Sequence, residues 1–384
     1  MSVQVCNRCV MDTSAPSIEF DETGNCQFCS NYLKRLDSMP SVETYSQQLN
    51  TLVDKIKSEG QGKEYDCIIG VSGGVDSTYV AYLVKNLGLR PLAVHLDNGW
   101  NSELAVSNIE KTLTKLNIDL YTHVIDWDEF RDLQMSFLKA STPGMEIPSD
   151  HAIYAVLNKM AARYKIRYII NGSNFKMEYI MEPAWSEMVG QMDWKLIKNV
   201  HKQFGRVKLK TYPHFSRMDL YFSRFVNRCS VVNILDYVDF SKNEAMKVIQ
   251  DKLGWVYYGG KHYESIYTRF TQAYIQPRKF AIDKRKAHYS NLICMGEMTR
   301  DEALLALKED AYPDESMKDK DLQFFKKKMG VSDEEFNVLM NQPVKAYKDY
   351  KGYFNSGLHG WLYKLALNVH FNLKGKGFYG KREA

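Results

Sequence analysis

No stretch of the 384-residue chain has the roughly 18 uninterrupted apolar residues that a membrane-crossing helix needs. The first residues, Met1 to Cys6, also lack the basic and apolar segments of a secretory signal peptide. These two absences argue against both an integral membrane protein and a secreted one. We therefore expect a cytoplasmic protein with no membrane partner.

The chain also lacks a large excess of charge of either sign. Its 51 basic and 46 acidic residues leave a formal net charge of +5, which suits an anionic small substrate as much as RNA. A hydrophobic fraction of 45% and a charged fraction of 25% are typical of soluble globular proteins. Charge and composition therefore decide little about the partner.

Cysteines are too few, and odd in number, for a disulfide framework. Four of the seven form a C-x2-C-x16-C-x2-C pattern, in which each pair can present two thiolates to one tetrahedral ion. We expect structural Zn²⁺ there, with an iron–sulfur cluster as the alternative, and the four positions are Cys6, Cys9, Cys26 and Cys29. The other cysteines, Cys67, Cys229 and Cys294, are single, and we expect them to be buried.

The order of apolar segments predicts an α/β fold. Short strand-like runs alternate with stretches of helical spacing, which implies a parallel sheet with helices on both faces. The predicted strands are 67–71, 92–97, 120–125, 167–170 and the start of 230–240, and a helix is predicted over 41–59. Capping boxes are predicted at 241–244, 299–302 and 332–335. We expect a cysteine module at 1–40, an α/β domain at 41–258 and a mostly helical region at 259–384.

A glycine-rich loop lies between the first predicted strand and the next helix. It reads Ser72-Gly73-Gly74-Val75-Asp76-Ser77, and a simple turn would explain its glycines but not its two serines and aspartate. Glycines let the backbone approach phosphate, and N–H groups at a helix start point toward an anion. Ser72 and Ser77 can donate to phosphate oxygens, while Asp76 is expected to hold Mg²⁺. The loop has no lysine, which excludes the ordinary P-loop.

This motif resembles that of the PP-loop, or N-type ATP pyrophosphatase, superfamily, whose pattern SGGxDS is matched at every position. The resemblance implies a Rossmann-like fold of the adenine nucleotide alpha hydrolase type. It also implies that the loop binds the pyrophosphate part of ATP while a substrate oxygen attacks the α-phosphate. Asp97, Gly172 and Asn174, at the ends of the second and fourth strands, would then lie near the nucleotide, although such turn sequences are common.

Superfamily membership leaves the second substrate open. Enzymes that thiolate tRNA usually carry a further cysteine pair near the ATP site, and no such pair follows the loop here. The chain resembles instead the N-acetyl sugar amidotransferases of surface-polysaccharide and O-antigen biosynthesis. The resemblance is carried by CNRCVMDT at 6–13, GGKHYES at 259–265 and FAIDKR at 280–285.

The resemblance to the amidotransferases implies conversion of the acetamido group of a nucleotide-activated sugar to an acetamidino group. Ammonia would come from glutaminase and cyclase-like partner subunits, and nucleic acid is not the expected partner. A tRNA-modifying enzyme of the 2-thiolation or lysidine type is the alternative, and a non-catalytic nucleotide-binding subunit is a third possibility.

Several residues of the C-terminal half are candidates for the reaction. Lys261 is expected to neutralise phosphate charge, and His262 and Glu264 to move protons, although His262 could equally be a surface or packed histidine. Weaker candidates for substrate contacts are Asp150, His151, Arg269, Lys284 and Arg285. For each of the basic ones, a solvated helix face is the competing explanation.

Overall fold

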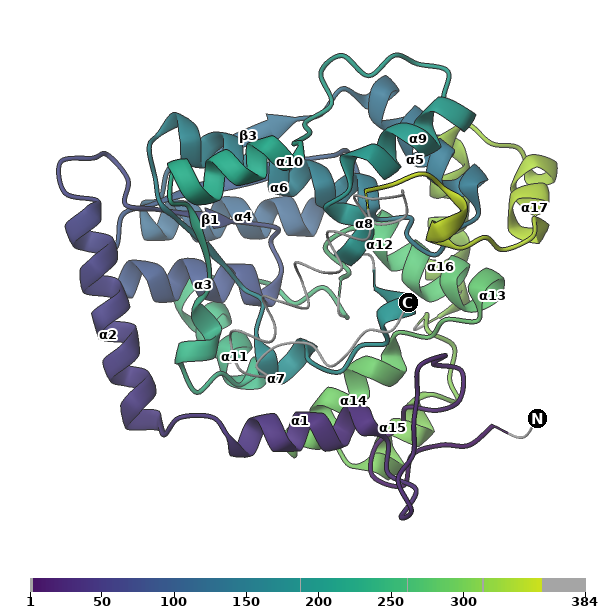
Figure 1. Ribbon diagram of the computed structural model, residues 1–384, viewed down its shortest axis with the longest axis horizontal. Coiled ribbons are helices and arrows are strands. Elements are labelled where there is room, and N and C mark those ends of the chain that lie inside the picture. The colour runs from purple at the N-terminus through teal and green to yellow at the C-terminus, as the bar shows by residue number, and fades with distance from the viewer. Residues whose placement is uncertain (1–2, 187, 261, 313, 354–384) are drawn as a thin grey trace.

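The computed structural model describes residues 3–186, 188–260, 262–312 and 314–353, and its centre is a five-stranded sheet (Figure 1). The strand order is β3-β2-β1-β4-β5, and every neighbouring pair is parallel. This confirms the predicted α/β class. The strands are β1 (Cys67–Gly70), β2 (Pro91–Asp97), β3 (Leu120–Val124), β4 (Tyr168–Asn171) and β5 (Ser230–Asn233).

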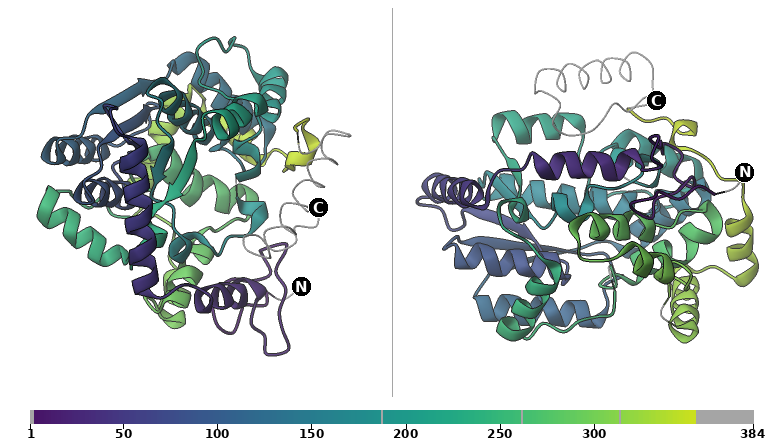
Figure 2. Two further views of the ribbon diagram at one scale, coloured as in Figure 1. Left: turned by 60° about the vertical axis from the view of Figure 1, so that its left-hand side comes forward. Right: turned by 90° about the horizontal axis from the view of Figure 1, so that it is seen from below.

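Helices cover both faces of the sheet, as Figure 2 shows. One face packs against α2 (Val42–Glu59), α3 (Val75–Asn86), α4 (Glu103–Leu116) and α11 (Lys242–Leu253), which share one apolar core with it. The other face packs mainly against α5 (Trp127–Ala140), α6 (Ile147–Arg163) and α9 (Trp194–Phe204). Burial on both faces explains why β1 and β4 read as continuous apolar runs instead of alternating patterns.

Short elements connect β4 to α11. They are α7 (Phe175–Glu178), η1 (Pro183–Trp185), α8 (Met188–Gln191), α10 (Arg217–Tyr221), η2 (Phe222–Val226) and η3 (Ile234–Tyr237). The predicted segment 230–240 is thus a four-residue strand followed by a 3₁₀ turn.

The region after residue 259 is helical as far as the structure describes it, as predicted. Its elements are α12 (Ile266–Phe270), η4 (Thr271–Ile275), α13 (Gln276–Phe280), α14 (Arg285–Met295), α15 (Arg300–Ala306), α16 (Glu315–Met329), α17 (Asp333–Asn341) and η5 (Tyr347–Asp349). The capping boxes at Thr299 and Ser332 are confirmed. The one at Ser241 is wrong, because the serine side chain makes no capping hydrogen bond. The S-x-x-E pattern sets residue types but not the rotamers that close the box.

The cysteine-rich N-terminal segment has little regular structure before α1 (Gln27–Asp37). Two isolated antiparallel bridges hold it, and it shares an apolar cluster with residues of α7 and α14. The Arg300 guanidinium donates to the backbone oxygens of Cys6 and Cys9 at 2.9–3.2 Å. The segment is therefore packed onto the C-terminal helices. Among the described residues, the structure contains no helix with the length and apolarity to cross a membrane.

Candidate nucleotide-binding and catalytic site

The glycine-rich loop connects the carboxyl end of β1 to the start of α3. Gly73 has φ +80°, and a Cβ atom there would lie 2.4 Å from the backbone oxygen of Ala105, so only glycine fits. A Cβ atom on Gly172, after β4, would lie 3.0 Å from the Cβ of Asp76. The ends of β1 and β4 therefore meet closely. The loop backbone leads directly into a helix N-terminus, which is a favourable place for an anion.

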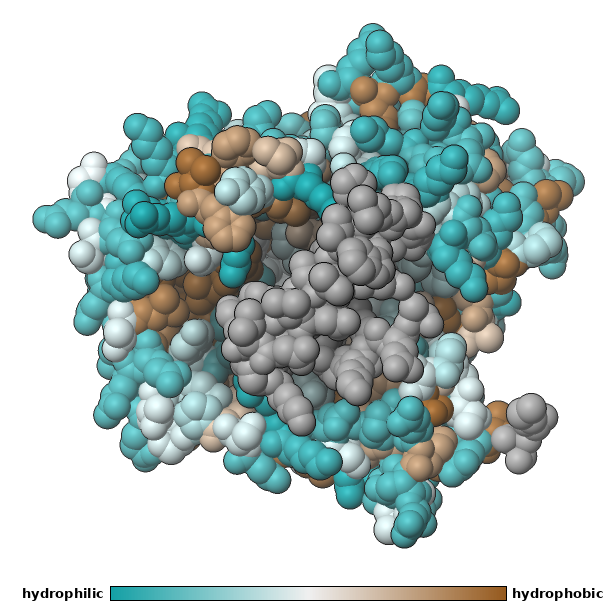
Figure 3. All heavy atoms as spheres, viewed as in Figure 1, coloured by the Kyte–Doolittle hydropathy of each residue, from teal (hydrophilic) through white to brown (hydrophobic). Residues whose placement is uncertain are grey.

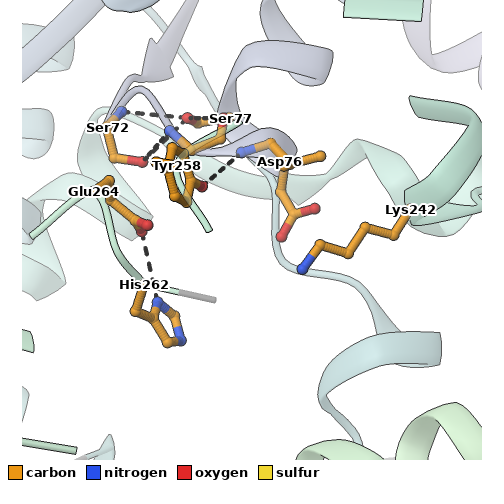
Figure 4. A pocket seen from close by; sticks show the side chains of 9 residues that line it. Ser72, Asp76, Ser77, Lys242, Tyr258, His262 and Glu264 are labelled. Carbon is orange, nitrogen blue, oxygen red and sulfur yellow. Dashed lines mark hydrogen bonds and ion pairs between the residues drawn. The ribbon is translucent and has the colours of Figure 1, made fainter. Parts of the chain in front are cut away.

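A pocket opens over this loop, and residues from three distant parts of the chain line it (Figure 4). The hydroxyl oxygens of Ser72 and Ser77 lie 3.2 Å apart on one wall. The carboxylate of Asp76 points into the pocket toward the ammonium of Lys242, as Figure 4 shows. The lining residues are Ser72, Gly74, Val75, Asp76, Ser77, Lys242, Tyr258, His262 and Glu264.

Sequence reasoning missed two of these residues, Lys242 and Tyr258. Lys242 is the first residue of α11 and supplies a cation to a loop that has none of its own. The sequence held a signal for Lys242. A lysine at the start of a helix interacts unfavourably with the helix dipole, so its presence there suggests a role other than helix stability. The Tyr258 hydroxyl lies 3.3 Å from the backbone nitrogen of Val75 and accepts its hydrogen bond. Its burial and the nearby Glu264 carboxylate raise the pKa of Tyr258.

Glu264 is a partly buried carboxylate at the wall of the pocket, with its side chain 17% exposed. Its Oε1 lies 3.6 Å from Nδ1 of His262, and its Oε2 has no hydrogen-bond partner within the described part of the chain. Burial alone would raise the pKa of Glu264, but the hydrogen bond and charge of His262 lower it below its ordinary value. A charged carboxylate with one unsatisfied oxygen is costly in the folded state and is a common feature of functional sites.

The backbone around Glu264 is attached to the α/β half of the chain. The Ser102 amide donates to the Glu264 carbonyl at 2.9 Å, and the Ile266 amide donates to the Trp100 carbonyl at the same distance. The indole of Trp255 donates to the backbone oxygen of Gly73, also at 2.9 Å. These contacts hold the C-terminal segment against the loop. Lys261, the remaining catalytic candidate of this segment, lies outside the described residues.

Two other predicted ATP contacts, Asp97 and Asn174, lie outside the lining of the loop pocket. Asp97 accepts from the Gly99 amide at 2.9 Å and lines a second hollow, of about 510 Å³, between β2, β3 and α4. Asn174 is buried and accepts from the Met177 amide at 2.9 Å, which caps α7. Neither side chain lines the loop pocket, so their contact with ATP stays a prediction.

One predicted substrate residue, His151, has its partners away from the loop pocket. His151 is fully buried and stacks on Phe215 with ring centroids 4.1 Å apart, while Nδ1 donates to the Gln191 carbonyl. Burial lowers the pKa of His151 to about 4, so it is a neutral packed side chain in this structure, and its contact with a substrate stays a prediction. The sequence alone does not distinguish a polar side chain that binds substrate from one that packs inside the protein.

The basic candidates are engaged in similar ways. The Arg269 guanidinium forms a two-point pair with Asp321, at 2.6 and 2.7 Å, and Arg285 pairs with Asp283 at 2.8 Å. Both pairs lie in the C-terminal region and neither arginine lines the loop pocket, so their contact with a substrate stays a prediction. Lys284 lies 4.0 Å from Glu146, and Asp150 lies in the first turn of α6; neither lines the loop pocket.

The four cysteines of the N-terminal pattern converge on one point. All are fully buried and reduced, and their sulfurs lie within 4.8 Å of one another. The closest sulfur–sulfur distances are 3.5–3.7 Å. Four sulfurs that bind one ion tetrahedrally, each at about 2.3 Å, would lie ~3.8 Å apart. The residues therefore fit structural Zn²⁺, held by Cys6, Cys9, Cys26 and Cys29.

Parts of the chain are similar to curated proteins. A 106-residue part, 27% of the chain, is 33% identical to a glutamine-hydrolyzing GMP synthase of Pyrobaculum aerophilum. A 93-residue part is 32% identical to an uncharacterized protein of Methanocaldococcus jannaschii, and covers 24% of this chain. The matched parts span 20% and 33% of those two relatives.

Solved structures with a distant likeness include NMN synthetase from Francisella tularensis, at 16% identity and a TM-score of 0.30, covering 58% of this chain and 99% of that one. NH3-dependent NAD synthetase from Campylobacter jejuni is 14% identical with a TM-score of 0.28, covering 55% and 84%.

Residues 264–362 match the family model described as "LPS biosynthesis protein WbpG-like, C-terminal domain". The match begins at Glu264, which lines the pocket of the glycine-rich loop. The resemblance to a surface-polysaccharide enzyme is thereby confirmed. The part of the chain that follows the α/β domain is therefore similar to the C-terminal domain of the WbpG-like LPS biosynthesis family.

Proposed function

We propose that this protein is an ATP-dependent amidotransferase that forms AMP and pyrophosphate. It would convert the acetamido group of a nucleotide-activated N-acetyl sugar to an acetamidino group for surface-polysaccharide (O-antigen) biosynthesis. The observation that carries the proposal is the single pocket in which the loop at 72–77 meets Glu264 of the WbpG-like domain. A pocket built from both parts of the chain suits a reaction between ATP and a sugar.

The loop side of the pocket is suited to polyphosphate. The N-terminus of α3 and the hydroxyls of Ser72 and Ser77 would receive phosphate oxygens, and Lys242 would supply the positive charge that the loop lacks. Asp76 points into the same space and would hold Mg²⁺, which prefers one or two carboxylates together with phosphate oxygens. Such fixed charges stabilise pyrophosphate as it leaves.

In the proposed reaction the acetamido oxygen bonds to the α-phosphorus of ATP as the bond from that phosphorus to pyrophosphate breaks. Ammonia then adds to the activated carbon, and AMP leaves with the original oxygen. The added nitrogen loses a proton, which the carboxylate of Glu264, whose Oε2 has no hydrogen-bond partner among the described residues, would accept. His262, 3.6 Å away, would pass that proton to solvent.

Ammonia is favoured as the second substrate for two reasons. The three cysteines outside the metal cluster are separate, and burial raises the pKa of each, so none resembles a sulfur-transferring thiolate. One curated relative, matched over 20% of its length, is a glutamine-hydrolyzing GMP synthase. We propose that glutaminase and cyclase-like partner subunits deliver the ammonia to this chain.

Product analysis tests the proposal. The purified protein is incubated with ATP, Mg²⁺, isotopically labelled ammonium and a panel of UDP-N-acetyl sugars. We expect AMP and pyrophosphate in equal amounts, and labelled nitrogen in an acetamidino sugar. Formation of ADP, or thiolation or lysidine formation on tRNA in place of the sugar product, would contradict the proposal.

Variants connect the reaction to the pocket. Glu264→Gln and Asp76→Asn are each expected to lower kcat at least about a hundredfold, the usual loss for a positioned proton acceptor or an essential charge. Glu244→Gln, an exposed glutamate on α11, is the matched control and should leave kcat unchanged. Full activity of Glu264→Gln would remove Glu264 from the mechanism.

A further inference from the structure

A stripe of apolar side chains on α10 and η2 faces solvent. Met218, Tyr221, Phe222, Phe225 and Val226 are 49–65% exposed, and they follow the spacing i, i+3, i+4, i+7, i+8. In most helices that spacing marks the face that packs on the core. Figure 3 shows the apolar side chains gathered over α10, in the upper left of the view, with hydrophilic residues around them. An exposed patch of this kind usually marks a binding surface.

The opposite side of the same segment holds it to the protein. Ser216 and Asp219 close a capping box at the start of α10. The hydroxyl of Ser223 donates to Asn158 of α6 at 2.7 Å, and buried Cys229 anchors the far end in the core. The segment is therefore ordered with its polar side inward, and its apolar stripe is presented outward.

The chain segment that carries this stripe is rich in positive charge. Residues 194–228 contain nine lysines and arginines and a single acidic residue, Asp219, although the whole chain has a net charge of only +5. The exposed cations are Lys198, Lys202, Arg206, Lys208, Lys210, Arg224 and Arg228. We call residues 194–228 the basic–aromatic face.

Two nearby carboxylates hold the loop of this face through its backbone amides. Glu129 accepts the backbone amides of residues 210–212 at 2.9–3.1 Å, and Asp132 accepts those of Arg206 and Val207 at 2.8 and 3.0 Å. Both acids bind the loop backbone, so the loop is fixed while its basic side chains point outward. The positive field of the face is thus a built feature of the fold.

The described chain ends against the same face. The Tyr353 amide donates to Asp193, and the Arg217 guanidinium lies 4.5 Å from the centre of the Tyr353 ring. Residues 354–384 follow and contain five lysines and arginines against one glutamate. The cations exposed on the face favour an anionic partner as its occupant.

We propose that the basic–aromatic face docks on the surface of an anionic lipid bilayer. Aromatic and aliphatic side chains on a helix bordered by lysine and arginine bind at the boundary between headgroups and acyl chains, and the cations contact anionic headgroups. The abundance of lysine favours this partner over a protein, because lysine is depleted in the cores of protein interfaces. This inference does not depend on the proposed reaction.

Vesicle sedimentation with the full chain tests the proposal. We expect binding to vesicles of equal parts phosphatidylcholine and phosphatidylglycerol, at least about tenfold weaker binding to pure phosphatidylcholine, and loss of binding at high salt. No binding to the mixed vesicles, or equal binding to both kinds, would overturn the proposal.

Variants locate the contact. Phe222→Ser with Phe225→Ser, and separately Lys208→Gln with Lys210→Gln, should each weaken vesicle binding at least about fivefold. The control is Leu305→Ser with Val338→Ser, two equally exposed apolar residues outside the face, which should bind as the unchanged chain does. Unaltered thermal unfolding shows that each variant folds. If the face variants leave vesicle binding intact but disrupt a dimer, an acidic protein complex or RNA binding, the face serves that partner and the proposal is refuted.

Discussion

The hydroxyl of Tyr258 accepts a hydrogen bond from the backbone N–H of Val75, 3.3 Å away, at the first residue of α3. This is the helix N-terminus at which a phosphate oxygen would be received. Tyr258 therefore occupies a donor that ATP would use, and the hydroxyl must leave that donor for the phosphate to bind there.

Removing the hydroxyl should strengthen nucleotide binding. Tyr258→Phe leaves the ring in place but frees the Val75 amide, and one neutral hydrogen bond contributes about 1 kcal/mol. We expect the Kd for ATP, measured by calorimetry, to fall about fivefold. Tyr257→Phe, at the exposed neighbouring tyrosine, is the control. Weaker binding by Tyr258→Phe would mean that the hydroxyl contacts the nucleotide directly.

Lys242 should contribute more to catalysis than any other lysine of α11. Lys242→Met removes the cation that faces Asp76 across the pocket, and kcat/KM for ATP is expected to fall at least about tenfold. Lys242→Arg should retain part of the activity, because it keeps the charge. Lys247→Met, on the exposed side of the same helix, should have no effect on the rate of AMP release.

The cysteine cluster should bind about one zinc ion per chain. Cys26→Ser removes one of four ligands, so metal analysis should show loss of zinc and thermal unfolding should occur at a lower temperature. Cys294→Ser, near the cluster but outside it, should keep the metal. Iron and sulfide in place of zinc would support the iron–sulfur alternative.

His151 should make the fold sensitive to acid. Its pKa is about 4 in the folded state because of burial, below the ordinary value of 6.5, so the unfolded chain takes up the proton first as the pH falls. The contribution of His151 to the free energy of unfolding is fully present above pH ~6.5 and is lost as the pH falls toward ~4. The loss is about 2 kcal/mol at pH 5.

Urea unfolding at pH 7.5 and pH 5 measures this loss. His151→Gln can still donate to the Gln191 carbonyl and accept from the Phe215 amide, but it does not titrate. The difference in unfolding free energy between the two pH values should therefore be about 2 kcal/mol smaller in the variant. An identical pH dependence in both proteins would show that His151 is protonated in the fold.

Local pattern alone determined much of this protein. The central strands β1, β2 and β4 were predictable because buried parallel strands are continuous apolar runs between helical segments, and each run is set by neighbouring residues. The loop at 72–77 and the spacing of the four cysteines could also be recognised in the sequence, because each is a local pattern. Phosphate binding and tetrahedral thiolate binding each need their residues close together in the chain.

Only the tertiary structure decided which distant side chains complete the pocket. Lys242 and Tyr258 join the loop from far along the chain because α11 and the segment after it pack beside α3, and no periodicity encodes that meeting. The same holds for the residues that the sequence placed at the substrate. Arg269, Arg285 and His151 each have an internal partner, and a side chain that binds a ligand looks the same in sequence as one that satisfies a buried partner.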